Sequence, residues 1–171
     1  EEPGETVAPP ALTAYEKYAA VYEQNPDFVG WISIDGTNIN YPVMQTPGNP
    51  DFYLKHAFDK SYSDYGVPYV QENCDLEQSD NVVIYGHHMK NGSMFGHLKK
   101  FVESDETYKK SKYFWILTPE KNYRYEIISA YTTGVNSDTY TLFKGPGEEF
   151  EQYLQKIKGY SEIQTEENEL T

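Results

Sequence analysis

The chain has 171 residues, the size of one ordinary domain, and its 27 acidic residues against 14 lysines and arginines give a net charge of −13. That charge excludes general nucleic-acid binding and electrostatic docking on anionic lipid, because both need a basic surface. The single cysteine excludes an intrachain disulfide framework, and no apolar stretch approaches the roughly 20 residues of a membrane span.

The first ten residues, EEPGETVAPP, are acidic and rich in proline, which is typical of a linker or stalk end. The chain does not begin with Met and shows no signal peptide, so we expect a soluble piece of a longer protein whose anchor, if any, lies upstream. Residues 11–171 are expected to form a single domain. It opens with an amphipathic helix from Ala11 to Gln24, which Asn25-Pro26 ends.

Short strands follow the first helix. Residues Phe28–Ile34 and Thr37–Val43 are predicted to form a hairpin around the turn Asp35-Gly36. Residues 47–58 are predicted to be a loop with a short helical turn. The remaining expected strands are Gly66–Val70, Asn81–Tyr85 (buried and almost entirely apolar), Tyr113–Thr118 and Tyr123–Tyr131.

Apolar residues at helical spacing predict two more helices, one from Met94 to Val102 and one from Glu148 to Ile157. Many short strands without regular βαβ alternation favour a mainly β fold, an antiparallel barrel or sandwich with helices inserted in its loops.

The segment 81–98, NVVIYGHHMKNGSMFGHL, carries the clearest chemical signal. Its strand delivers Gly86 and then His87 and His88 onto a loop. A histidine at a strand end can act as acid or base near neutral pH, and Gly86 would leave the imidazole accessible. Taken alone, such a pair is more often a structural or surface feature.

A metal site would need His87, His88 and His97 to converge. Adjacent residues on an extended backbone point to opposite sides, and the sequence contains neither HExxH nor Cys-x-x-Cys. We therefore expect no metal and no other cofactor.

The only thiol and the only arginine are weak candidates for catalysis. Cys74 lies among Glu72, Asp75 and Glu77, which disfavour a thiolate, so we expect a non-catalytic residue in a loop or at a strand end. Arg124 lies in an alternating strand on the face opposite Tyr123 and is expected to be a surface charge.

Five segments point to a known family: PDFVGWISIDGTNINYPVMQTPGNPDFYL, YGVPYVQENC, NVVIYGHHMKNGSMFGHLKKF, YEIISAYTT and EEFEQYLQKIK. They resemble the class B sortases, cysteine transpeptidases on the outer face of the Gram-positive cell membrane. The resemblance covers about residues 15–171, and the Gly-His motif followed by MKNGSMFG is specific to this group.

The resemblance implies an eight-stranded β-barrel with N-terminal helices and a helix inserted before the strand that carries the catalytic cysteine. It makes His87 the catalytic histidine and gives no chemistry to His88. The catalytic Cys and Arg of the family do not map onto Cys74 and Arg124. The Cys is expected a few residues beyond Thr171, on a strand that starts at Glu169–Thr171, and the Arg is expected beyond it on the last strand. The 171 residues are therefore expected to be inactive.

The implied reaction cleaves a C-terminal sorting signal of a secreted protein after Thr, through a thioester. A peptidoglycan-precursor amine or a pilin lysine then accepts the protein. By position, Asn49, Leu54, Tyr140 and Thr141 are candidates for binding the peptide, although packing explains each about as well. Two alternatives remain open, a non-enzymatic sortase-like module that binds a peptide or protein partner and an acidic adhesin domain.

Overall fold

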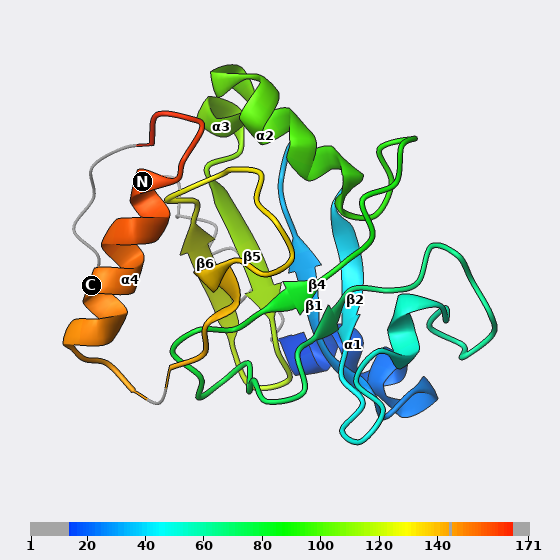
Figure 1. The fold of residues 1–171 in the computed structure, drawn as a ribbon. Helices are drawn as coiled ribbons and strands as arrows, with labels where there is room; N and C mark the ends of the chain where they lie inside the picture. Colours follow the sequence, from blue (N-terminus) through cyan, green and yellow to red (C-terminus); the bar gives the residue numbers. More distant parts are fainter. Residues whose placement is uncertain (1–13, 144, 166–171) are drawn as a thin grey trace, which may run out of the picture.

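Six strands form one curled sheet in the order β4-β3-β2-β1-β5-β6 (Figure 1). The computed structural model describes residues 14–143 and 145–165. The strands are β1 (Phe28–Ser33), β2 (Asn40–Met44), β3 (Tyr69–Val70), β4 (Ile84–Tyr85), β5 (Tyr113–Leu117) and β6 (Asn122–Glu126).

The strand pairing confirms the predicted mainly β fold, in which every strand pair but one is antiparallel. The neighbours β1–β2, β1–β5, β3–β4 and β5–β6 are antiparallel. Strands β2 and β3 are parallel, with Met44 opposite Tyr69, because residues 45–68 carry the chain back before β3 begins. In the described part of the chain, β4 and β6 each have a neighbour on one side only.

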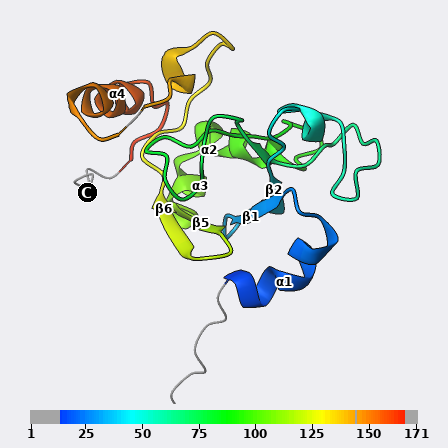
Figure 2. The same cartoon turned by 90° about the horizontal axis from the view of Figure 1, so that it is seen from below.

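Helices lie at the ends and on the outside of the curl. Helix α1 (Ala14–Gln24) lies on the outer side of the sheet below β1, and α4 (Glu148–Gly159) lies beyond β6 (Figure 2). None of the helices in the described residues is long and apolar enough to cross a membrane. The other helical segments are η1 (Phe52–Leu54), η2 (Phe95–Leu98), α2 (Lys99–Glu103), α3 (Asp105–Lys110) and η3 (Asp138–Tyr140).

Strand β1 buries side chains in both core clusters, and its register with β2 shifts between Phe28 and Gly30. Phe28, Gly30 and Ile32 are buried, whereas the residues between them are half-buried. Ile32 belongs to the main core inside the curl, which also contains Val43, Val70, Phe101 and Ile116. A second core cluster contains Phe28, Met44, Tyr53, Val67 and Tyr69, and it lies where α1 and η1 meet the sheet.

All six predicted strands are present, and each is shorter than expected; Gly66–Val70, for example, is strand only at Tyr69–Val70. Asn81–Tyr85 is half-buried throughout, and only Ile84–Tyr85 is strand, because the Asn81 carbonyl and the Val83 amide bond to the sulfur of Cys74 at 3.6 and 3.5 Å. Strand β6 ends at Glu126, where its partner β5 has run out at Tyr113.

The predicted helices are present with shifted bounds. The segment expected to be one helix from Met94 to Val102 is the 3-10 turn η2 followed by α2. Helix α3 was not predicted, and the side chain of Ser104 caps it by accepting from the Glu106 amide at 3.2 Å. The predicted linker, the first three residues of the predicted first helix, and Glu169–Thr171 lie outside the described residues.

Candidate functional site

His87 lies two residues after the end of β4, and its imidazole contacts a carbonyl from a distant loop. The side chain is half-buried, and Nε2 lies 2.6 Å from the main-chain oxygen of Leu54, the last residue of η1. A carbonyl oxygen can only accept, so Nε2 carries the proton in this bond. In the neutral ring, Nδ1 is then the basic atom.

Two glycines on either side of His87, Gly86 and Gly96, have no room for a side chain unless a neighbour moves. A Cβ on Gly86 would lie 2.5 Å from the ring of Phe95, and one on Gly96 would collide with the carbonyl of Met89. The Phe95 amide donates to the His87 carbonyl at 2.8 Å. The main chain on both sides of His87 is therefore held against the loop that follows it.

A carboxylate lies within electrostatic reach of His87. Hydrogen bonds from Tyr62 and Lys55 hold the pKa of Asp64 below its ordinary value, and the positive charge of His87 lowers it further. The Lys55 ammonium lies 3.0 Å from Asp64, and both side chains are about half exposed or more. Asp64 is therefore an ionised carboxylate near His87, and its ion pair with Lys55 offsets its charge.

Three tyrosine rings, one each from β3, β4 and η3, pack in a row. The ring of Tyr85 lies 5.5 Å from that of Tyr69 and 6.2 Å from that of Tyr140, between centroids. Burial raises the pKa of Tyr85, and the nearby Tyr140 raises it further. Tyr140, which is 38% exposed, thus lies against a residue only two positions before His87.

The other two candidate peptide-binding residues are exposed at the surface. Thr141 is held through its main chain, since the side-chain amide of Asn81 donates to its carbonyl at 2.6 Å. Asn49 lies three residues before η1 begins; its amide donates to the Thr46 carbonyl, and its carbonyl accepts from the amide of Phe52, the first residue of η1. The structure thus brings Leu54 into contact with His87 and Tyr140 against Tyr85, and it leaves Asn49 on the loop before η1.

The histidines considered for a metal site have different partners. His88 is exposed, whereas His97 bonds to Asn38 at 3.2 Å, and burial lowers the pKa of His97 with a contribution from the charge of Lys100. Within residues 14–143 and 145–165, no three His, Cys, Asp or Glu side chains form a group that could hold a metal ion.

Cys74 and Arg124 have structural surroundings. Cys74 is only 5% exposed and belongs to the main core. Arg124 is exposed on β6 opposite Trp115, with its guanidinium 4.8 Å from the ring centre of Tyr113. Cys74 therefore lacks the exposed setting in which a cysteine becomes a nucleophile.

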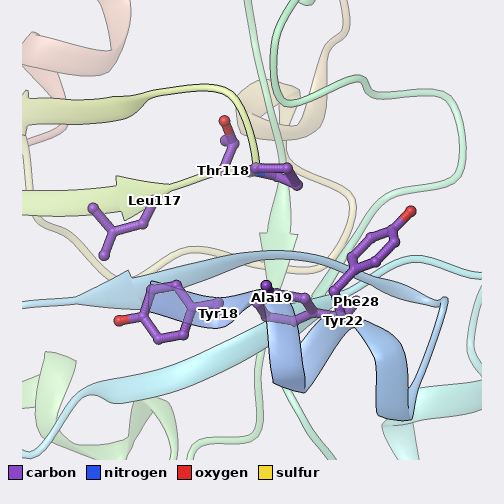
Figure 3. A pocket seen from close by; sticks show the side chains of 7 residues that line it. Tyr18, Ala19, Tyr22, Phe28, Leu117 and Thr118 are labelled. Carbon is purple, nitrogen blue, oxygen red and sulfur yellow. The ribbon is translucent and has the colours of Figure 1, made fainter. Parts of the chain in front are cut away.

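Two pockets lie away from these side chains. One, between α1 and the sheet, encloses about 10 Å³, enough for one water, and its lining includes Tyr18, Tyr22 and Phe28 (Figure 3). The other is an open recess between residues 131–138 and Tyr160. His87 lines neither of them, and its ring faces the carbonyl of Leu54 rather than one of these pockets.

Sequence reasoning missed two contributors to the site, Tyr85 and Asp64. Leu54 is expected by position to bind the peptide, and the structure shows in addition that its carbonyl contacts His87. Tyr85 directly precedes the Gly-His pair and could have been found from that position. Asp64 lies in a polar stretch of the sequence with no pattern that singles it out.

Comparison with known proteins gives one consistent result. Residues 32–164 match the model of the sortase domain. Sortase B of Listeria monocytogenes is 37% identical over 147 residues, which cover 80% of this chain and 55% of that protein. Sortase B of Staphylococcus aureus is 30% identical over 155 residues, which cover 89% of this chain and 62% of that protein.

Solved structures agree with this comparison. A Staphylococcus aureus sortase B-substrate complex superimposes with a TM-score of 0.81 at 26% identity, covering 89% of this chain and 70% of the other. The chain therefore spans little more than half of the length of the two relatives and shares their fold over most of its own length.

Proposed function

The chain belongs to the sortase family and is class B-like, and from this we propose that His87 is the acid–base residue of a cysteine transpeptidase. The proposal concerns the whole protein, because the 171 residues span 55% and 62% of the two relatives. The observation that carries it is the half-buried imidazole at the end of β4, with its Nε2 proton bound to the Leu54 carbonyl.

The proposed reaction has two halves. A cysteine thiolate attacks the carbonyl carbon of the Thr in a sorting signal, the peptide C–N bond breaks, and a thioester forms. The imidazolium of His87, which carries a second proton on Nδ1, gives that proton to the departing amine and becomes neutral. An acceptor amine, from a peptidoglycan precursor or a pilin lysine, then attacks the thioester. The new amide bond forms, the thiolate leaves, and the proton of the amine returns to His87.

We propose that the nucleophile is not Cys74. This thiol is 5% exposed in the core, and attack on a peptide carbonyl requires contact with the substrate. Arg124 is exposed beside Tyr113 and is not proposed to act on the oxyanion. Both groups are instead proposed to come from residues beyond Thr171, so that the 171 residues by themselves do not turn over substrate.

We propose that the sorting peptide lies along η1 and η3, where Asn49, Leu54, Tyr140 and Thr141 contact it. Support comes from the contact of Leu54 with His87, from the packing of Tyr140 against Tyr85, and from the similarity to a sortase B-substrate complex. The protein is proposed to act on the outer face of a Gram-positive cell membrane, through an anchor outside this chain, without a cofactor.

Turnover of a sorting peptide with an added amine tests the proposal in the protein encoded by the complete gene. We expect His87→Ala to lower kcat/KM by roughly 100- to 10,000-fold, the usual contribution of a general acid–base residue. The matched control is His88→Ala, which changes an exposed neighbour and should retain activity. Cys74→Ala should also retain activity per folded molecule, and the 171-residue chain should show none.

Two results would contradict this assignment. Loss of turnover in Cys74→Ala, with the thermal midpoint unchanged, would make Cys74 the nucleophile. Binding of the peptide with no turnover by the complete protein would instead favour the non-enzymatic module.

A further inference from the structure

The Leu54 carbonyl, which contacts His87, directly follows a fully buried tyrosine in the chain. Tyr53 is 0% exposed and directly precedes Leu54 in η1. Its hydroxyl accepts from the side-chain amide of Asn25 at 2.8 Å and donates to the carboxylate of Asp27 at 2.8 Å. Asn25 and Asp27 lie at the junction of α1 and β1, so this junction fixes one side of η1.

The same junction is tied to the loop that follows η1. The amide of Asn25 also donates to the Phe58 carbonyl at 2.7 Å, and Lys60 forms an ion pair with Asp27 at 2.9 Å. Burial raises the pKa of Asp27, but hydrogen bonds from Lys60 and Tyr53 and the charge of Lys60 together lower it below its ordinary value. Asp27 therefore stays ionised and keeps accepting the Tyr53 hydrogen bond.

A glycine holds η1 from the other side. Gly66 has φ of +58°, and a Cβ there would lie 2.7 Å from the carbonyl oxygen of Leu54, the atom that binds His87. It would also collide with the carbonyl of Tyr53, which accepts from the Val67 amide at 3.0 Å. Only a residue without a side chain lets this stretch pack against the two carbonyls.

We propose that Tyr53 and Gly66 are positioning residues for His87. Together they hold the Leu54 carbonyl within hydrogen-bond distance of Nε2 of His87, so that the proton stays on Nε2. Nδ1 is then the ring atom that takes up and returns the proton of the reaction. The second half of this statement rests on the proposed function, whereas the first concerns the ground-state imidazole alone.

The lifetime of the Nε2 proton of His87 in the 171-residue chain tests the first half without any turnover. In ¹⁵N-labelled protein near pH 8.5, about two units above the ordinary imidazole pKa, a bonded Nε2 proton exchanges slowly with water and gives its own signal. The chain has four histidines, and the spectrum of His87→Gln assigns the signal.

Gly66→Ala is the main variant, and Gly48→Ala is its matched control. Gly48 also has a positive φ, +84°, but a Cβ there meets nothing within 4 Å, so the control carries the backbone strain without the contact. We expect Gly66→Ala to shorten the lifetime of the Nε2 proton at least tenfold and Gly48→Ala to leave it unchanged. Tyr53→Phe, which keeps the ring and removes the hydroxyl, is a second variant and should shorten it as well.

Equal proton lifetimes in the wild type, Gly66→Ala and Tyr53→Phe would overturn the proposal. An equal loss in Gly48→Ala would overturn it too, since general strain would then explain the effect. Turnover separates this proposal from the proposed function. If Gly66→Ala loses the Nε2 signal while kcat in the complete protein is unchanged, the positioning stands and His87 is not the acid–base residue.

Discussion

Gly86 connects strand β4 to His87, and it has no room for a side chain. A Cβ at this position would lie 2.5–2.8 Å from three ring atoms of Phe95. Such overpacking costs roughly 1–3 kcal/mol, because the ring or the main chain must move. Any such movement would occur in the main chain or ring directly beside His87.

We therefore expect Gly86→Ala to lower the free energy of unfolding by about 1–3 kcal/mol, measured by urea denaturation. Gly134→Ala is the control: a Cβ there meets nothing within 4 Å, and the change should stay within about 0.5 kcal/mol. Adding Phe95→Leu to Gly86→Ala should recover part of the loss. A loss of equal size in both glycine variants would contradict the packing argument.

The position of His87 could be predicted from residues, but its partner could not. An apolar run followed by Gly-His indicates a histidine at a strand end, and the structure has it there. The partner is a main-chain oxygen of Leu54, 33 residues away, and no side-chain pattern states where a carbonyl points. The burial of Cys74 was equally hidden, because its acidic neighbours indicate an exposed loop.

At the scale of elements, α4 holds the short helix η3 in place. The Tyr153 hydroxyl donates to the Thr139 carbonyl at 2.7 Å, and Lys156 forms an ion pair with Asp138. Burial raises the pKa of Tyr153, so this hydroxyl keeps its proton well into the alkaline range. Since η3 ends at Tyr140, the docking of α4 determines how Tyr140 lies against Tyr85.

We expect Tyr153→Phe to cost about 1 kcal/mol, the usual net value of one hydrogen bond, and to raise amide hydrogen exchange in residues 138–141. Gln155→Ala, an exposed change on the same helix, should leave both quantities nearly unchanged. Exchange that is as slow in Tyr153→Phe as in the wild type would show that α4 does not hold η3.

Elements with several periodic apolar residues were predictable, and elements that depend on one contact were not. The segment Glu148–Ile157 has four apolar residues on one face, and the observed helix is Glu148–Gly159. Helix α3 has one buried residue, Tyr108, and is otherwise polar, so it has no periodicity to detect. Strand β4 was predicted too long because the Asn81 carbonyl and the Val83 amide bond to the sulfur of Cys74, so the regular pairing with β3 covers only Ile84–Tyr85.

At the scale of the whole molecule, the tyrosines dominate the response to alkaline pH. Burial raises the pKa of Tyr53 to about 12, and the bond to Asp27 adds to it. The pKa values of Tyr69, Tyr85 and Tyr153 are raised as well, with burial the largest cause in each. A tyrosine whose folded pKa is raised stabilises the fold fully below pH 10, and this contribution is lost as the pH rises toward the folded value.

We expect the wild type to lose stability steeply between pH 10 and about 12, with up to about 2 kcal/mol of the loss due to Tyr53. Tyr53→Phe should be less stable at pH 7, and its decline across this window should be shallower. Urea denaturation at a series of pH values measures both slopes. Identical slopes would mean that Tyr53 ionises in the folded protein as readily as in the unfolded chain.

The neighbours of β1 in the sheet come from very different parts of the chain. It pairs with β2 through a short turn, but on its other side Trp31 lies opposite Leu117, 86 residues later. A ribosome that adds about 5–20 residues per second needs on the order of ten seconds to deliver that second partner. During this interval the hairpin of β1 and β2 has an open apolar edge, so a newly made chain is most exposed to wrong pairing before β5 emerges.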